Sequence, residues 1–375
     1  MASTAAEIDT EIHAETRRVL AICDACGYCN GFCDLFTAAR QRPALTDADL
    51  AYLANLCHAC RNCFYACQYA PPHDFAVNVP RTLARMRHQS YLEHVWPQAC
   101  APLLNHPLLT VIAVTLAAIL GLWGLTRLNL PNPADPSAAL FYRVLPWEVM
   151  IWIGLAPLTW SVLALGIGWR RYWRLIRPHD LNYLNTTQRS GWRTGWRVLR
   201  DVLRLRNLRG GGVGCNDLDD RFSHARRWLH QLLLGGLALS FAATVTASFY
   251  HHGLNLAAPY PLLSLPVLLG TGGGIAVCLS TLGLGWIEWR AAPEPLAREA
   301  QRLDRALLGL LFLVASSGLV LLGWRMTAAM PLLLCVHLGS VLAFFLLLPY
   351  SKFVHAGYRV FSAMSFQLPA TSYKR

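Results

Sequence analysis

The chain has 375 residues, of which 54% are hydrophobic and only 14% are charged. This composition is too apolar for an ordinary soluble domain. The formal net charge is +12, almost all of it from arginine, and long apolar runs lie between the basic stretches. A basic balance alone is compatible with nucleic acid binding, but in combination with such runs it favours a membrane protein. The sequence therefore predicts a membrane protein with no nucleic acid partner.

Eight cysteines near the N-terminus form two runs with the same spacing. Each run reads C-x2-C-x2-C-x3-C, and both lie between residues 23 and 67. Bacterial ferredoxins bind [4Fe–4S] clusters with this spacing, and in two-cluster ferredoxins the fourth cysteine of each run ligates the other cluster. The sequence therefore predicts one cluster on Cys23, Cys26, Cys29 and Cys67, and a second on Cys57, Cys60, Cys63 and Cys33.

Two other uses of these cysteines fit the pattern less well. A disulfide framework is typical of secreted proteins, and the opening residues MASTAAEIDTEI contain no apolar signal-peptide stretch. Structural zinc uses two C-x2-C pairs rather than a repeated triple run closed by x3-C. Asp34 and Gln68 stand where ferredoxins usually have proline after the fourth cysteine. The sequence therefore does not predict the conformation of the local turn. The remaining cysteines are expected to be free thiols: Cys100, Cys215, Cys278 and Cys335.

Helical patterns flank the two cysteine runs. Residues 7–22 have helical apolar spacing, and Thr46 with Asp49 three residues later predicts a capped helix start between the runs. A basic helix is expected over 74–88, with Asp74 as its cap. A helix between the cluster loops resembles the α-helical ferredoxin domain of succinate dehydrogenase and heterodisulfide reductase subunits. Residues 1–95 are therefore predicted to form such a domain.

The remaining residues, 96–375, contain six apolar segments. Each is close to the ~20 residues that a membrane-spanning helix needs. A soluble bundle of buried helices is the alternative, but six such lengths in one chain disfavour it. The predicted fold class is all-α, with an α-helical ferredoxin domain followed by a six-helix transmembrane bundle. The expected spans are 103–125, 147–168, 228–250, 262–287, 305–324 and 331–350.

The placement of arginine predicts the orientation of these spans. Segments 169–227 and 288–305 carry many arginines, whereas 251–261 has no arginine or lysine. The positive-inside rule then places both basic loops and both termini in the cytoplasm, with the bundle in a bacterial inner membrane. Residues 189–209 predict an amphipathic helix on the lipid surface. The glycines of Gly210–Asn216 allow a close backbone approach, so this stretch is expected to face the cluster domain or a partner.

Histidines at membrane depth are functional candidates because ionisable residues are costly there. His230 lies near the start of the third span and His251 and His252 at its end, while His337 lies in the sixth span and His355 just after it. Along continuous helices, each separation is about 30 Å, and the two helices run antiparallel. His230 would then meet His355, and His337 would meet His251 or His252, which is an arrangement that ligates one or two b haems. The alternative is that each histidine caps a helix or forms a hydrogen bond within the bundle.

Several segments resemble known families. CHACRNCFYACQYAPPHDFAVNVP, RRWLHQ, YHHGLNLAAPYPLLSLPVLLG and LRNLRGGGVGCN are similar to the tricarballylate (citrate) utilization protein B family, and His337–His355 resembles the last haem-binding helix of the nitrate reductase gamma subunit. The resemblance implies two iron–sulfur clusters, b haem, and electron transfer to the quinone pool from an FAD-dependent dehydrogenase docked on the cytoplasmic face. The chain has no G-x-G-x-x-G after a strand, so the flavin belongs to the partner.

Two other functions are alternatives to an electron-transfer subunit, and each lacks a feature that it needs. A membrane thiol–disulfide reductase subunit of heterodisulfide reductase type would need a paired-cysteine CCG motif, which this sequence lacks. A membrane redox sensor would need an output module, and the short tail after His355 leaves little room for one. The electron-transfer subunit is therefore the preferred prediction.

Overall fold

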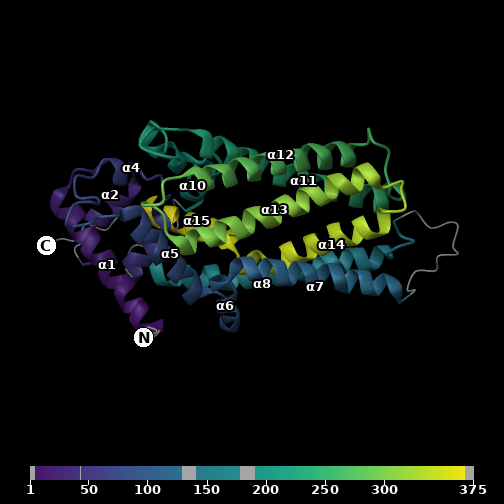
Figure 1. The fold of residues 1–375 in the computed structure, drawn as a ribbon, viewed down its shortest axis with the longest axis horizontal. Coiled ribbons are helices and arrows are strands. Elements are labelled where there is room, and N and C mark those ends of the chain that lie inside the picture. The colour runs from purple at the N-terminus through teal and green to yellow at the C-terminus, as the bar shows by residue number, and fades with distance from the viewer. Residues whose placement is uncertain (1–4, 43, 129–140, 178–190, 368–375) are drawn as a thin grey trace.

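The computed structural model of the chain describes residues 5–42, 44–128, 141–177 and 191–367. Over these ranges it contains helices and no β-strand, apart from one isolated bridge between Cys215 and Ser223. Figure 1 shows an elongated molecule in which short helices gather at one end and long helices run along its length. The predicted all-α fold is confirmed.

The short helices form the end that carries the two cysteine runs. The N-cap predicted for α3 is present: Thr46 Oγ1 accepts a hydrogen bond from the Asp49 amide at 3.2 Å, and the Asp49 carboxylate accepts one from the Thr46 amide at 3.1 Å. Helices α1 and α3 both pack against α5. These helices are α1 (Ala5–Cys26), α2 (Asp34–Arg40), α3 (Asp47–Leu56), α4 (Asn62–Tyr65) and α5 (Val79–His94).

Helix α5 begins later than the sequence predicts. Asn78, rather than Asp74, is its N-cap, and the Asn78 side chain accepts a hydrogen bond from the Arg81 amide at 3.1 Å. Pro80 lies in the first turn of the helix, where a missing N–H costs nothing. Asn78 also donates to the Glu294 carbonyl at 2.7 Å, so a contact with a distant segment favours this cap.

Among the residues that the structure describes, six helices are long and apolar enough to cross a membrane, which indicates a multi-pass membrane protein. Their outer surface is apolar, as contact with lipid requires, and α7 shows this most clearly. Its exposed side chains recur at helical spacing and include Leu108, Leu109, Ile112, Leu116 and Leu120. The six helices are α7 (Pro107–Arg127), α8 (Trp147–Ile176), α11 (Ala225–Leu254), α12 (Leu265–Arg290), α13 (Arg298–Trp324) and α14 (Met330–Leu347).

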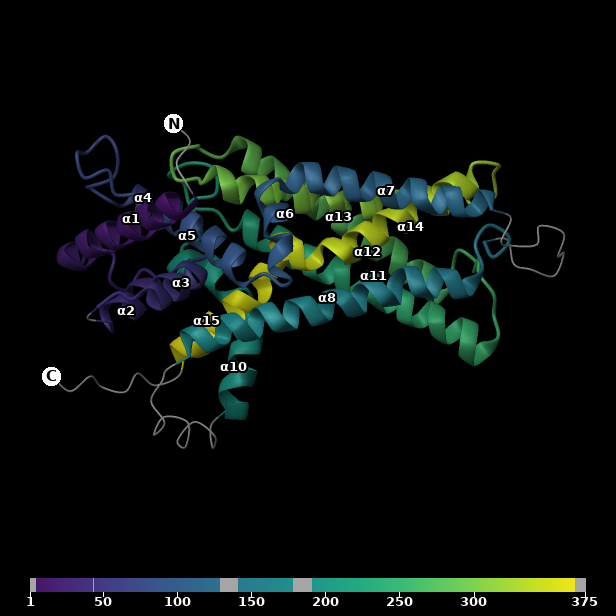
Figure 2. The same cartoon turned by 90° about the horizontal axis from the view of Figure 1, so that it is seen from below.

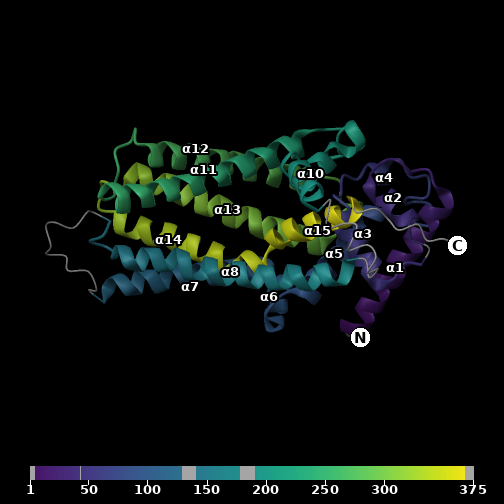
Figure 3. The same ribbon diagram turned by 180° about the vertical axis from the view of Figure 1, so that it is seen from behind.

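Shorter elements connect these helices or follow them. Figure 3 shows α10 and α15 at the same end of the bundle as the cysteine-containing helices. The shorter elements are two α-helices of the connections, α6 (Ala101–Asn105) and α10 (Gly191–Leu203), the 3₁₀ turns η1 (Gln98–Cys100), η2 (Arg206–Gly212), η3 (Leu348–Tyr350) and η4 (Lys352–Val354), and the last helix α15 (His355–Gln367).

The sixth span does not continue as one helix to His355, so the single helix assumed from the sequence is wrong. Helix α14 ends at Leu347, and two 3₁₀ turns separate it from α15. Pro349 has no N–H for the Phe345 carbonyl four residues earlier, and that carbonyl instead accepts a hydrogen bond from the Ser161 hydroxyl. Helix α15 lies beside the end of α8 and also packs against α3 (Figure 2).

Helices α11 and α12 approach each other through small residues. A Cβ atom on Gly273 would lie 2.8 Å from the Gly236 carbonyl oxygen and 2.6 Å from the Ser240 hydroxyl. Glycine at such positions lets two backbones pack closely in a membrane, where van der Waals contact drives helix association.

Gly273→Ala is therefore expected to lower the thermal unfolding midpoint of the detergent-solubilised protein, because the added methyl group overpacks the α11–α12 contact. Overpacking of this kind costs about 1–3 kcal/mol. Gly272→Ala is the matched control, since a Cβ there meets nothing within 4 Å. Equal midpoints for the two variants would show that the contact is looser than described.

Candidate functional site

The first cysteine run lies where α1 ends. Cys23 and Cys26 belong to the last turn of α1. Gly27, with a φ of +68°, ends the helix, and its amide donates to the Cys23 carbonyl at 2.9 Å. A left-handed residue at this position closes a helix and turns the chain, and glycine adopts it without strain. The turn brings Cys29 back toward the helix end.

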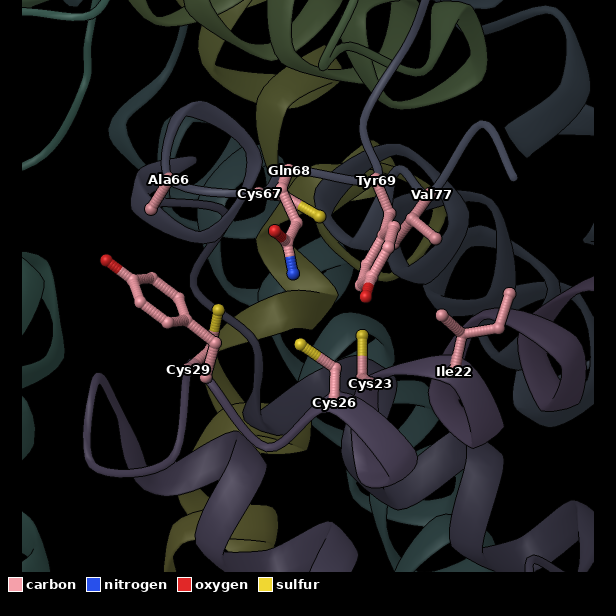
Figure 4. Close-up of a pocket in the computed structure, with 10 residues that line it drawn as sticks. Ile22, Cys23, Cys26, Cys29, Ala66, Cys67, Gln68, Tyr69 and Val77 are labelled. Atoms are coloured by element: carbon pink, nitrogen blue, oxygen red, sulfur yellow. The ribbon is translucent and has the colours of Figure 1, made fainter. Parts of the chain in front are cut away.

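Cysteines from both runs line one pocket. It has a volume of about 260 Å³ and is lined by Cys23, Cys26 and Cys29 of the first run and by Cys67 of the second. Figure 4 shows the sulfur atoms of all four directed toward the same space. Burial, followed by the neighbouring thiols of Cys29, Cys67 and Cys26, raises the pKa of Cys23 to about 12. The structure thus brings together the four side chains predicted for one cluster, which we call the first set.

The other four cysteines form a second group, which we call the second set. Burial, followed by Cys57 and Cys60, raises the pKa of Cys33 to about 12. Burial, followed by Cys60, Cys57, Cys33 and, last, Cys29 of the first set, raises the pKa of Cys63 well above its usual range. Each thiol therefore lies close enough to its neighbours for their charges to interact. The second set again takes three members from one run and one from the other.

Both sets have the donor chemistry of a cluster site. Among the described residues, no three His, Cys, Asp or Glu side chains are gathered closely enough to hold a single metal ion. A [4Fe–4S] cluster instead spreads four thiolates over separate irons. Buried thiols with a raised pKa stay protonated unless a metal centre deprotonates them. Four cysteines per set fit a cluster in donor type and number.

A loop of the membrane domain covers the second set. Asn62, which lies next to Cys63, donates to the carbonyls of Gly210 at 3.1 Å and Gly214 at 2.9 Å. The Asn216 amide donates to the Cys60 carbonyl at 3.0 Å. A Cβ on Gly210, which has a φ of +53°, would lie 2.7 Å from the Asn62 amide nitrogen. The prediction that Gly210–Asn216 faces the cluster domain is confirmed.

Two arginines and a cysteine at this contact were not recognised from the sequence as parts of the site. Arg226 donates to the carbonyls of His58 at 2.7 Å and Ala59 at 3.0 Å, and Arg61 donates to the Asp217 carbonyl at 2.7 Å. Cys215, expected to be a free thiol, is buried. Its thiol donates to the Leu208 carbonyl at 3.3 Å, and its proximity raises the pKa of Cys60.

The structure brings His230 and His355 together at the end of the bundle next to the two cysteine runs, which we call the cluster end. Their ring centroids are 6.3 Å apart and the ring planes are inclined by 64°. His355 Nδ1 lies 2.5 Å from the Lys352 carbonyl oxygen, which orients the ring and leaves Nε2 available. Iron- and zinc-ligating histidines are commonly oriented by such a bond. By donor type and pairing, these two histidines could hold a haem.

The second predicted pair is not in ring contact. His337 Nδ1 lies 3.1 Å from the Ser317 hydroxyl, and a Cβ on Gly318 would lie 2.9 Å from the His337 ring. His251 and His252 contact each other and Trp147 instead. Over the described ranges, no ring contact links His337 to either of them.

Comparisons with known proteins place the chain in a family. A family model described as citrate utilization protein B matches residues 97–372, and one described as the citrate utilization protein B Fer4-like domain matches residues 16–93. This chain belongs to the citrate utilization protein B family. It is 38% identical over 365 residues to citrate utilization protein B of Escherichia coli, which covers 97% of this chain and 94% of that protein. No solved structure matches it. The family predicted from the sequence is confirmed, and its Fer4-like domain is consistent with electron transfer.

The contact made by Arg226 can be tested directly in this family member. Arg226→Ala removes two hydrogen bonds to the backbone of the second run, so the amides of residues 57–65 should exchange with deuterium about tenfold faster. Arg227→Ala is the matched control, because Arg227 donates only to the exposed Arg204 carbonyl among the bonds described. Equal exchange in the two variants, measured by mass spectrometry, would contradict this role.

Proposed function

We propose that this chain is a membrane electron-transfer subunit that reoxidises a soluble FAD-dependent dehydrogenase and delivers the electrons to the quinone pool. When bound, two [4Fe–4S] clusters and b haem supply one-electron transfer, which protein side chains alone do not provide. The observation that carries this proposal is the grouping of eight cysteines into two sets at the bundle end where His230 and His355 face each other.

The residues proposed to hold each group follow from that arrangement. His230 and His355 ligate a b haem at the cluster end, and His337 with His251 or His252 ligates a second one. Ser317 already orients His337, as a ligating histidine requires. The cysteines ligate the clusters as two mixed sets: Cys23, Cys26, Cys29 and Cys67 for one, and Cys33, Cys57, Cys60 and Cys63 for the other.

The two sets differ in how far a partner can approach them. At the first set Cys26 is exposed, and Tyr28 and Phe75 are 65% and 49% exposed. The second set lies under the Gly210–Asn216 loop. A dehydrogenase would therefore dock at the first set, and the second set would hold its cluster under the loop, on the side that carries His230 and His355.

The cluster end is proposed to lie in the cytoplasm, with the bundle in the bacterial inner membrane. The described parts of the arginine-rich segments, residues 169–177, 191–227 and 288–305, lie at that end (Figure 3), in keeping with the positive-inside rule. Helix α10 exposes Trp196, Leu199 and Leu203, which suits a helix lying on the lipid surface.

The substrate class comes from the family. The relative from Escherichia coli is named for citrate utilization. A dehydrogenase acting on tricarballylate or a similar tricarboxylic acid is therefore the proposed partner. Substrate recognition belongs to that partner, and this chain provides its oxidant.

The mixed sets make a prediction for spectra of the reduced protein. Cys67→Ser should change the same EPR signal as Cys23→Ser, and Cys33→Ser should change the same signal as Cys57→Ser, because these pairs share a cluster. Cys100→Ser is the control and should leave both signals unchanged. A Cys67→Ser spectrum matching Cys57→Ser would mean that each run holds its own cluster.

The whole function can be tested with the purified chain in quinone-containing vesicles, reduced by an FAD-dependent tricarballylate dehydrogenase. The wild-type chain should pass electrons to quinone. His355→Ala should lose the haem at the cluster end and stop quinone reduction, while the dehydrogenase still reduces the clusters. His224→Ala is the control, because His224 is exposed at the start of α11. No quinone reduction by the wild-type chain, or normal reduction by His355→Ala, would contradict the proposal.

A further inference from the structure

Among the described residues, one cationic side chain at the cluster end, Arg359, has a buried nitrogen without a hydrogen-bond partner. Arg359 belongs to α15, one helical turn after His355, so both project from the same face of the helix. Its Nε atom is shielded from solvent and has no hydrogen-bond partner. In the described ranges of the chain no carboxylate forms an ion pair with it.

The neighbouring cations are already engaged. Arg87 donates to the carbonyls of Ala54 at 2.8 Å and Cys57 at 2.6 Å. Lys352 forms an ion pair with Asp304 at 2.7 Å. Arg226 holds two backbone carbonyls of the second run. Arg359 is therefore the cation of this group whose buried Nε donor is not used.

A bound anion would stabilise Arg359 in its surroundings. Burial, followed by the positive charges of Arg87 and Arg226, lowers the pKa of Arg359 to about 10. The hydroxyl of Tyr91, another electrostatic neighbour, is buried and also lacks a hydrogen-bond partner. An enclosed cation among other cations is costly unless a negative group compensates it. Two unused donors, one charged and one neutral, thus lie close together.

Arg359 also lies close to the histidine pair. After burial, its charge is the largest influence on His355, whose pKa is lowered well below its usual range. Any anion bound by Arg359 would therefore sit next to a group held by His230 and His355. A b haem has two propionate carboxylates, and the planar guanidinium fork matches a carboxylate with two parallel hydrogen bonds.

We propose that Arg359 binds a propionate of the haem held by His230 and His355, with the Tyr91 hydroxyl as a second donor. This inference rests on the haem ligation given in the proposed function. It goes beyond that function by naming what recognises the carboxylate edge of the haem.

The first test measures how fast the haem leaves the intact, solubilised protein for an apomyoglobin acceptor. Loss of a charge-assisted hydrogen bond should make release from Arg359→Gln about tenfold faster. Arg359→Lys should fall between this variant and wild type, and Tyr91→Phe should have a smaller effect. Arg302→Gln is the control, since it removes an exposed charge of α13. Equal release from wild type and Arg359→Gln would overturn the proposal.

The second test separates a propionate from a lipid phosphate or free phosphate. Chain produced without haem is reconstituted with haem or with haem dimethyl ester, whose propionates carry no charge. With the ester, wild type and Arg359→Gln should release the ligand at similar rates. A tenfold difference that persists with the ester would assign Arg359 to another anion and overturn the proposal.

A third measurement separates haem recognition from folding. In the His355→Ala background, Arg359→Gln should not lower the thermal unfolding midpoint, because an unpartnered cation is being removed. A lower midpoint there would make Arg359 a structural residue and overturn the proposal. Absence of haem from the wild-type chain would instead refute the proposed function itself, so the two failures are distinguishable.

Discussion

The attachment of the second cysteine run to the loop before α11 is the contact on which the rest of the arrangement depends. Arg226, Arg61 and Asn62 all donate to backbone carbonyls across this contact. Buried carbonyl groups need hydrogen-bond donors. Removing one of these side chains would leave such carbonyl groups unpaired and would lower the stability of the contact. The cluster domain and the bundle therefore meet in a fixed geometry, and the second set is held beside the histidine pair.

The break before α15 provides the other half of that geometry. A continuous sixth helix would have carried His355 along the direction of α14, whereas the turns at Pro349 redirect the chain against α3 and α8. Tyr172 of α8 then lies 2.6 Å from the Ser362 hydroxyl, and the rings of Tyr91 and Tyr358 are 5.0 Å apart. The helix that begins with His355 is thus packed directly on the domain that carries the cysteines.

Features encoded by local spacing were predictable from the sequence. The Thr46–Asp49 cap, the six spans and the grouping of the cysteines all follow from residues a few positions apart or from a repeated motif. Features decided by distant contacts were not. Asp74 and Asn78 are both good caps; Pro80 suits a start at Asn78, and the bond to Glu294 adds a distant contact that the sequence does not show. Pro349 is visible in the sequence, but the apolar run around it conceals the break. The pairing of His337 with His251 or His252 stays a prediction.

Some of the arginines also have a second role, inside the fold, that the sequence alone does not show. The positions of the arginines along the chain indicate the membrane topology, because the positive-inside rule depends only on where they lie relative to the spans. In the fold, Arg61, Arg87, Arg226 and Arg359 turn inward around the second set and the histidine pair. Burial and the charge of Arg226 lower the pKa of Arg61 to about 10, which shows that these cations oppose one another. Such a group is stable only beside negative charge. Asp217 supplies part of that charge to Arg226 at 3.8 Å, and the proposed thiolate-ligated clusters and haem carboxylates would add to it.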